Sequence, residues 1–226
     1  MRALFERYRV NLSEKQEEKL SKYADLLIEY NGRFNLTAIT DREEIFVKHF
    51  LDSALGISCV QPGNLIDIGS GGGLPAVPIA VFREDVFVTM LEATGKKCDF
   101  LNAVIETLNL KNARVLNGRA EEYSRMQTYR ERFDCCTARA VARMNTLCEY
   151  ALPFVRVGGS FVAYKGDAAE ETAEAVRAIA LLGGRLKEEK RMELEGACRT
   201  IVVVEKVKST PPQYPRGRGK ERKQPL

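Results

Sequence analysis

Short apolar runs alternate with amphipathic segments through the middle of the chain. The runs at 65–68, 86–91, 113–116, 133–138 and 160–164 predict buried strands. Between them, apolar residues at three- and four-residue spacing predict helices over 95–109, 144–152 and 168–182. Such alternation indicates a doubly wound α/β domain, in which a parallel sheet is covered by helices on both faces.

The segments on either side of this pattern differ from it. Ser13 is placed to cap a helix over 13–30, and a second helical stretch follows Asp41. Beyond a strand near 185–186, the apolar run 200–205 follows after only a loop, which is compatible with an antiparallel strand. We therefore divide the chain into a helical N-terminal extension (1–63), an α/β domain (64–206) and a tail (207–226).

Composition excludes several classes of protein. Of the 226 residues, 45% are hydrophobic and 29% charged, as in globular proteins. No apolar run approaches the roughly 20 residues that span a bilayer, and the charged start 1–7 is unlike a secretory signal. The six cysteines form no Cys-x-x-Cys pair, and four lie in apolar or amphipathic stretches. We expect a reduced, cytoplasmic protein with no membrane partner, and a monomer.

The net charge of +4 is concentrated in the last part of the chain. Residues 206–226 carry seven basic side chains, one acidic side chain and four of the eight prolines. The remaining residues therefore have a net charge of −2. Basic tails of this kind usually bind polyanions, so we expect the tail to seek one.

The most informative segment, 67–75, reads Asp-Ile-Gly-Ser-Gly-Gly-Gly-Leu-Pro and follows the first predicted strand. Glycines at this point let the backbone turn tightly and approach a ligand closely. A dinucleotide-binding fingerprint would need glycine where Leu74 stands. The spacing Asp-x-Gly-x-Gly-x-Gly, with Gly69 and Gly71 at its centre, is instead that of S-adenosylmethionine-dependent methyltransferases. A tight loop without a ligand is the alternative.

An acidic residue after the second strand supports a nucleoside ligand. Glu92 lies 23 residues after Gly69, where the doubly wound fold places a carboxylate against ribose hydroxyls. A carboxylate accepts both hydroxyl protons at once. A solvated acid at the end of a strand is the alternative.

Four more candidates follow the later strands. Ala120 and Glu121 come after the third strand, beside which adenine lies in such sites, although Glu121 fits equally well as a helix cap. Arg139 and Lys165 end the fourth and fifth strands, at the edge where ligands bind in this architecture. For Arg139, a buried structural pair with an acid is the alternative.

Metal chemistry is not expected. His49 is the single histidine, so a site with several histidines is excluded, and a core role for His49 is more common than catalysis. Cys135 and Cys136 are adjacent in a strand and cannot both face one side of it, which favours core packing over metal binding.

Beyond these patterns, the chain resembles the RsmG (GidB, glucose-inhibited division protein B) methyltransferases of bacterial 16S ribosomal RNA. The resemblance spans most of the chain. The matching segments are Asn35–Thr40 with Lys48–Ser53, Asp67–Pro75 with Pro78, Arg119–Glu121 with Thr137–Ala142, and Lys165-Gly166 with Thr210-Pro211 and Tyr214–Arg216. Two positions depart from the family: Glu92 stands where many members have Asp, and 217–223 is more charged than the family's Gly- and Pro-rich version.

The resemblance implies a Rossmann-like class I methyltransferase that methylates N7 of a guanine in 16S rRNA. The implied cofactor is S-adenosylmethionine, and the implied partner is 16S rRNA or an assembling small ribosomal subunit. Matching family positions place cofactor contacts at Gly69, Leu74, Ala120, Glu121 and Arg139.

The expected chemistry suits this inventory of residues. Guanine N7 carries a lone pair and no proton, so its attack on the sulfonium methyl needs no general base. Arg139 and Lys165 are the catalytic candidates, because they are placed to orient the guanine or a flanking phosphate. Two alternatives remain: a methyltransferase for a protein or small molecule, against which the basic tail argues, and an RNA-binding module without turnover, against which the intact glycine loop argues.

Overall fold

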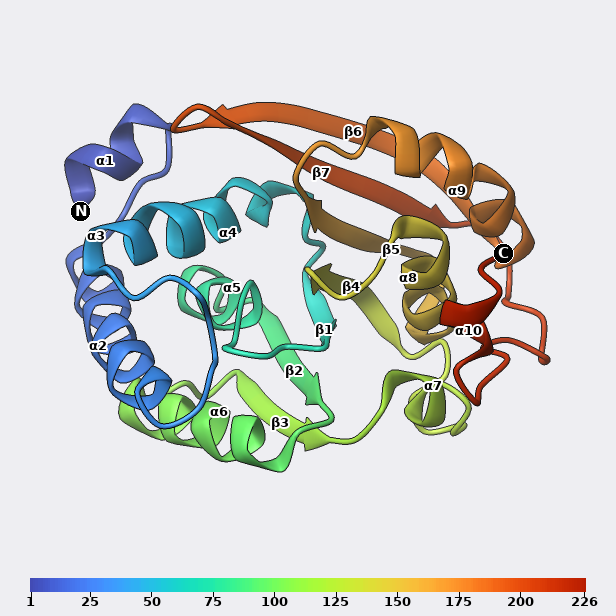
Figure 1. Ribbon diagram of the computed structural model, residues 1–226, viewed down its shortest axis with the longest axis horizontal. Coiled ribbons are helices and arrows are strands. Elements are labelled where there is room, and N and C mark those ends of the chain that lie inside the picture. The colour runs from blue at the N-terminus through green and yellow to red at the C-terminus, as the bar shows by residue number, and fades with distance from the viewer.

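The computed structural model describes residues 1–226, and its centre is one seven-stranded sheet with the order β3-β2-β1-β4-β5-β7-β6 (Figure 1). Strands β1 to β5 are parallel, whereas β7 is antiparallel to both β5 and β6. The predicted doubly wound α/β fold is confirmed. The strands are β1 (Gly63–Ile68), β2 (Val86–Glu92), β3 (Ala113–Asn117), β4 (Phe133–Arg139), β5 (Val155–Lys165), β6 (Gly184–Leu194) and β7 (Ala197–Lys206).

Helices cover both faces of the sheet (Figure 1). Strand β1 is buried on both sides, since Leu65 packs into one apolar cluster and Ile66 and Ile68 into the other. The helices are α1 (Arg2–Arg7), α2 (Glu14–Asn31), α3 (Arg42–Ile45), a π-helix (Phe46–Leu51), α4 (Asp52–Leu55), α5 (Ala76–Phe82), α6 (Gly95–Thr107), α7 (Ala120–Tyr123), α8 (Met144–Ala151), α9 (Ala169–Leu181) and α10 (Lys220–Lys223), with 3-10 turns at Ile57–Cys59 and Leu152–Phe154. None of them combines the length and the apolar character that crossing a lipid bilayer requires.

The N-terminal helices belong to the same core as the sheet. Ser13 and Gln16 form the reciprocal cap that begins α2, as the sequence predicts. Leu20, Tyr23 and Leu27 of this helix are fully buried against α5 and α6. The Tyr23 hydroxyl donates a hydrogen bond to the carbonyl oxygen of Gly72, so this helix fixes the glycine loop from outside the sheet.

The basic tail, which we expect to bind a polyanion, is folded against the α/β domain. Residues 207–226, named here the carboxyl-terminal strap, return to α7 and α8 (Figure 1). The guanidinium of Arg130 donates to the carbonyl oxygens of Thr210 and Tyr214, both at 2.9 Å. Arg216 pairs with Glu149, whose side chain is fully buried. Part of the strap's charge therefore serves the fold, and only the remainder is free for a partner.

Candidate active site

Two cavities open at the carboxyl edge of the parallel strands. The larger has a volume of about 950 Å³ and lies over the ends of β1, β2 and β3. The smaller, of about 330 Å³, lies over the ends of β4 and β5. Arg139 and Ala140 line the smaller cavity and Val141 lines the larger one, so the segment 139–141 is the wall between them. Because the strand order reverses between β1 and β4, this is the position where doubly wound folds bind ligands.

The glycine loop shapes the floor of the larger cavity. Gly69 and Gly71 have φ angles of +67° and +56°, a region that residues with a Cβ rarely adopt. A Cβ on Gly69 would lie 2.9 Å from Cγ2 of Val141. Gly69 itself lines the cavity, whereas Gly71 does not. The loop therefore needs glycine both for its backbone conformation and for its close approach to the wall.

Glu92 connects the glycine loop to the end of β2. Its carboxylate accepts the backbone N–H of Gly71 on Oε2, at 2.9 Å, and that of Thr94 on Oε1, at 2.8 Å. The side chain is 7% exposed and lines the larger cavity. Each oxygen can accept a second hydrogen bond, so the carboxylate that fixes the loop can also meet ribose hydroxyls.

Asp67, at the end of β1, carries a buried oxygen without a partner. Its Oδ1 accepts from the hydroxyl of Thr137 at 2.7 Å, but Oδ2 has no hydrogen-bond partner. Burial raises the pKa of Asp67 to about 6, so it is mostly ionised at neutral pH. Unpaired buried carboxylate oxygens are costly, and one beside a glycine loop suits a cationic ligand. A ligand with a ribose and a sulfonium, such as S-adenosylmethionine, fits these three features.

The remaining predicted cofactor residues divide between two environments. Ala120 and Glu121 begin α7 and line the larger cavity together with Gly69 and Glu92. Leu74 instead is 7% exposed, belongs to the apolar core and lines neither cavity.

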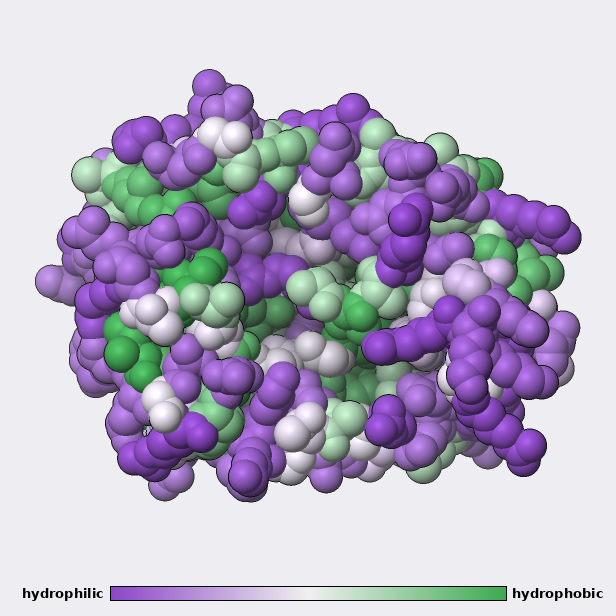
Figure 2. All heavy atoms as spheres, in the orientation of Figure 1, coloured by the Kyte–Doolittle hydropathy of each residue, from purple (hydrophilic) through white to green (hydrophobic).

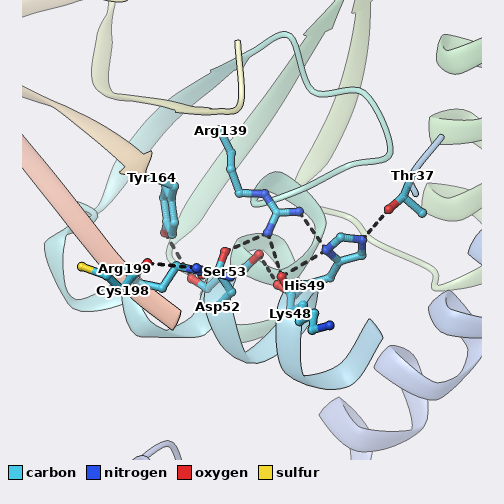
Figure 3. A network of polar contacts seen from close by, with 9 residues as sticks. All are labelled: Thr37, Lys48, His49, Asp52, Ser53, Arg139, Tyr164, Cys198 and Arg199. Atoms are coloured by element: carbon cyan, nitrogen blue, oxygen red, sulfur yellow. Dashed lines mark hydrogen bonds and ion pairs between the residues drawn. The ribbon is translucent and has the colours of Figure 1, made fainter. Parts of the chain in front are cut away.

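Arg139 lies in the smaller cavity and is held by the N-terminal helices (Figure 3). Its Nη1 donates to Oδ2 of Asp52 at 2.9 Å, and its Nη2 donates to Nδ1 of His49 at 3.2 Å. The second oxygen of Asp52 accepts from Nε of Arg199 at 2.8 Å. The structural pair that the sequence left open is thus present, and Arg139 does not line the larger cavity where a cofactor contact was expected.

Lys165 lies in the same cavity. Its Nζ donates to the carbonyl oxygen of Ala142 at 2.7 Å and to Glu171 at 3.0 Å. The smaller cavity is therefore lined by four cationic side chains, those of Lys48, Arg139, Lys165 and Arg199, each paired with a neighbouring acid.

His49 is a neutral member of this network. Burial, together with the charge of Arg139, lowers its pKa to about 4, so it carries no charge at neutral pH. Nδ1 lies 3.2 Å from Nη2 of Arg139 and 3.1 Å from the carbonyl oxygen of Lys48, and Nε2 lies 2.7 Å from the hydroxyl of Thr37, so both ring nitrogens are engaged. His49 is buried, as a core residue would be, but it also lines the smaller cavity.

Sequence reasoning missed several residues around these cavities. Asp52 and Arg199 hold or line the smaller cavity, and Val141, Tyr150 and part of the strap line the larger one. Asp52, Val141 and Arg216 stood inside the matching segments Lys48–Ser53, Thr137–Ala142 and Tyr214–Arg216, but no role had been assigned to them. The others lie far along the chain from their partners, so no local spacing could have indicated them.

Comparison with known proteins identifies the family. A family model described as "GidB: rRNA small subunit methyltransferase G" matches residues 16–202. The ribosomal RNA small subunit methyltransferase G of Desulfitobacterium hafniense (strain Y51) is 45% identical over 224 residues, which cover 98% of this chain and 94% of the relative. Its counterpart from Leuconostoc citreum (strain KM20) is 44% identical over 224 residues, with coverage of 96% and 94%.

Solved structures of other proteins share the fold at low sequence identity. P. horikoshii TYW2 in complex with MeSAdo has a TM-score of 0.55 at 16% identity, over 69% of this chain and 61% of that one. The precorrin-6y C5,15-methyltransferase of Geobacter metallireducens GS-15 has a TM-score of 0.53 at 13% identity, over 74% and 90%. These structures support the class I methyltransferase fold, and the relatives decide the family. The chain belongs to the GidB family of rRNA small subunit methyltransferases G.

Proposed function

We propose that this protein transfers the methyl group of S-adenosylmethionine to N7 of a guanine in 16S rRNA. Membership of the GidB family makes it an rRNA methyltransferase. The observation that carries the finer proposal is the larger cavity, which Gly69 and Glu92 line, with the unpaired oxygen of Asp67 buried at the end of β1 close behind Gly69. The cofactor would supply the methyl group, already activated on a positively charged sulfur.

The residues of the larger cavity would hold the cofactor as follows. Glu92 accepts the ribose hydroxyls, and Ala120 and Glu121 lie where the adenine is expected. Gly69 lets the backbone approach the methionine end, and Asp67, buried outside the cavity lining, adds a negative charge behind this loop. Gly71 and Leu74 act through the shape of the loop, because neither lines the cavity.

The smaller cavity is proposed as the acceptor side. It lies across the wall 139–141 from the larger one, so a base placed there is next to the methionine end of the cofactor. Arg139 and Lys165 bring N–H donors, which suit guanine O6 or a flanking phosphate. Arg139 stands on the wall itself, where its guanidinium also suits the carboxylate of the cofactor.

Catalysis then rests on orientation rather than on proton transfer. N7 has no proton to lose, and the one histidine is neutral and engaged with Thr37 and Arg139. Holding N7 in line with the methyl carbon and the sulfur contributes on the order of 7–11 kcal/mol. The N7 edge is hard to reach in an RNA duplex, so the target guanine must lie in a loop or be opened.

Mapping of the methylated product tests the proposal. The purified protein is incubated with methyl-labelled S-adenosylmethionine and either unmodified 16S rRNA or small subunits that lack the modification. Nuclease digestion and mass analysis are expected to yield N7-methylguanine from at least one of these substrates. A product methylated on carbon or on an exocyclic amine would contradict the absence of a general base, and no product on either RNA would contradict the proposal itself.

The pH dependence gives a second expected result. His49, with its pKa lowered to about 4, stays neutral at pH 5 and above, and Asp67, with its pKa raised to about 6, is ionised above that value. The single-turnover rate at saturating substrates should therefore be flat between about pH 7 and 9. Below about pH 6, Asp67 takes up a proton, its attraction for the cationic cofactor is lost, and cofactor affinity falls.

The His49→Asn variant is the control for this profile. Since His49 does not titrate in the window, the variant should show the same flat region even if its rate or stability changes. A rise in rate through a pKa that disappears in His49→Asn would show that the histidine acts as a base.

A further inference from the structure

The carboxyl-terminal strap forms part of the wall of the larger cavity. Residues 216–220 and Arg222 line it opposite Gly69 and Glu92, and Tyr150 of α8 lies beside them. The strap therefore meets the same cavity as the glycine loop, although the two are separated by about 145 residues of sequence. Any ligand in that cavity lies next to the strap.

Buried contacts fix this part of the strap. Glu149 accepts Nη2 of Arg216 at 2.7 Å and the backbone N–H of the same residue at 2.8 Å. Glu221 is also fully buried: its carboxylate accepts the N–H of Gly217, and its carbonyl oxygen accepts the hydroxyl of Thr146 at 2.8 Å. With Arg216 paired to Glu149 and Glu221 bonded to Gly217 and Thr146, the strap presents its other charged side chains from a fixed position.

Those other side chains are cations without ion-pair partners. Five basic residues of the cavity lining form no salt bridge: Arg119, Arg125, Arg218, Lys220 and Arg222. Figure 2 shows strongly hydrophilic residues over the region of α10, where three of the five gather. Unpaired cations held together at a cavity mouth raise the local potential and attract a polyanion.

The cofactor does not account for these cations. S-Adenosylmethionine carries a sulfonium, an ammonium and one carboxylate, so its net charge is +1, and the acids Glu92 and Asp67 suit it. The acids Glu92, Glu121 and Glu122 also line the cavity, and against them the five unpaired cations leave an excess of two positive charges, which opposes entry of the cofactor. A phosphodiester chain is the ligand whose charge they match.

We propose that the strap is a wall shared by the RNA site and the cofactor site. Its cations bind rRNA phosphates at the mouth of the larger cavity and thereby raise the affinity for the cationic cofactor behind them. The inference rests on the proposed function. Bound phosphates neutralise the cations that oppose the cofactor, so RNA and cofactor bind with positive coupling, and the coupling is reciprocal. The demethylated product, S-adenosylhomocysteine, has no net charge, so bound RNA should change its affinity little.

Two ligands that cannot donate a methyl group distinguish the effect of ligand charge on affinity from the effect of ligand shape. Sinefungin carries an ammonium where S-adenosylmethionine carries its sulfonium, and it cannot donate a methyl group. Calorimetry would measure its affinity and that of S-adenosylhomocysteine, with and without an unmodified 16S rRNA transcript. For the natural protein, RNA is expected to raise the affinity for sinefungin about fivefold more than the affinity for S-adenosylhomocysteine.

The key variant is Arg218→Gln/Lys220→Gln/Arg222→Gln, in which all three changed side chains are exposed. Without RNA it should bind sinefungin as tightly as the natural protein or more tightly. Its RNA affinity should fall, and the slope of log affinity against log salt should become shallower by about two. The difference in coupling between sinefungin and S-adenosylhomocysteine should largely disappear.

Two controls are available. Arg177→Gln/Lys187→Gln/Arg191→Gln removes the same charge from exposed positions that line neither cavity, and it should keep the coupling. Arg218→Lys/Arg222→Lys keeps the charge, and it should retain both the salt slope and the coupling. Thermal melting verifies that each variant is folded.

The inference is overturned if RNA raises the affinities for both ligands equally, or if the triple glutamine variant matches the natural protein. Formation of N7-methylguanine in the same experiments would leave the proposed function standing. If the natural protein neither binds nor methylates 16S rRNA, both the function and the inference fail.

Discussion

Replacing Glu92 by glutamine is expected to weaken binding of S-adenosylmethionine by about 10- to 100-fold. The carboxylate accepts two backbone N–H groups on two different oxygens, those of Gly71 and Thr94. A carboxamide has one oxygen, so its NH₂ group would face an N–H donor in a buried position. Leaving such a donor unpaired costs about 1–3 kcal/mol, and the glycine loop would shift to avoid it.

Calorimetry on the purified variant measures this effect directly. Glu122→Gln is the matched control, because Glu122 lines the same cavity but is exposed and accepts no comparable hydrogen bond. We expect that control to bind the cofactor within about threefold of the natural protein. Equal affinities of Glu92→Gln and the natural protein for the cofactor would show that Glu92 does not contribute to cofactor binding.

Replacing Glu149 by glutamine should lower the free energy of unfolding by about 3 kcal/mol, because one partner of a buried ion pair is lost. Arg216 then faces an NH₂ group in place of one carboxylate oxygen, and the strap loses its main anchor. For a chain of this size, the melting temperature should fall by about 6–12 °C. Calorimetric melting and urea titration both give the value.

The exposed pair Arg143–Glu174 provides the comparison for Glu149. Its side chains are 63% and 49% exposed, against 22% and 0% for Arg216 and Glu149. Arg143→Gln should therefore change the free energy of unfolding by less than about 1 kcal/mol. If the two variants melt at the same temperature, the strap is not anchored by its buried acid.

The fold could be predicted because its signals are local. The spacing of apolar residues over a few positions predicts strands such as 65–68 and helices such as 13–30. The glycine loop is recognised from its composition. Glu92 was found because its distance from the loop along the chain is that of one β-α-β unit in the doubly wound fold. Short elements without periodicity, such as α1, α7 and α10, were not predicted.

Pairs between distant residues could not be predicted. Arg139 was correctly expected at the carboxyl edge of the sheet, but its direction is set by Asp52, 87 residues away. Likewise, the basic composition of the tail gave its charge but not its path, which is set by Glu149 and Arg130. A sequence pattern specifies which element a side chain belongs to, whereas its partner depends on how the elements meet.

The wall between the two cavities is held in a strained conformation. Ala140 has a φ of +56°, which costs an L-residue about 1–2 kcal/mol. This backbone persists because its neighbours restrain it: Arg139 is bound to Asp52, and Val141 lies against Gly69. Breaking either contact would let Ala140 relax toward ordinary backbone angles. A change in one cavity that breaks such a contact would therefore displace the wall 139–141 of the other cavity.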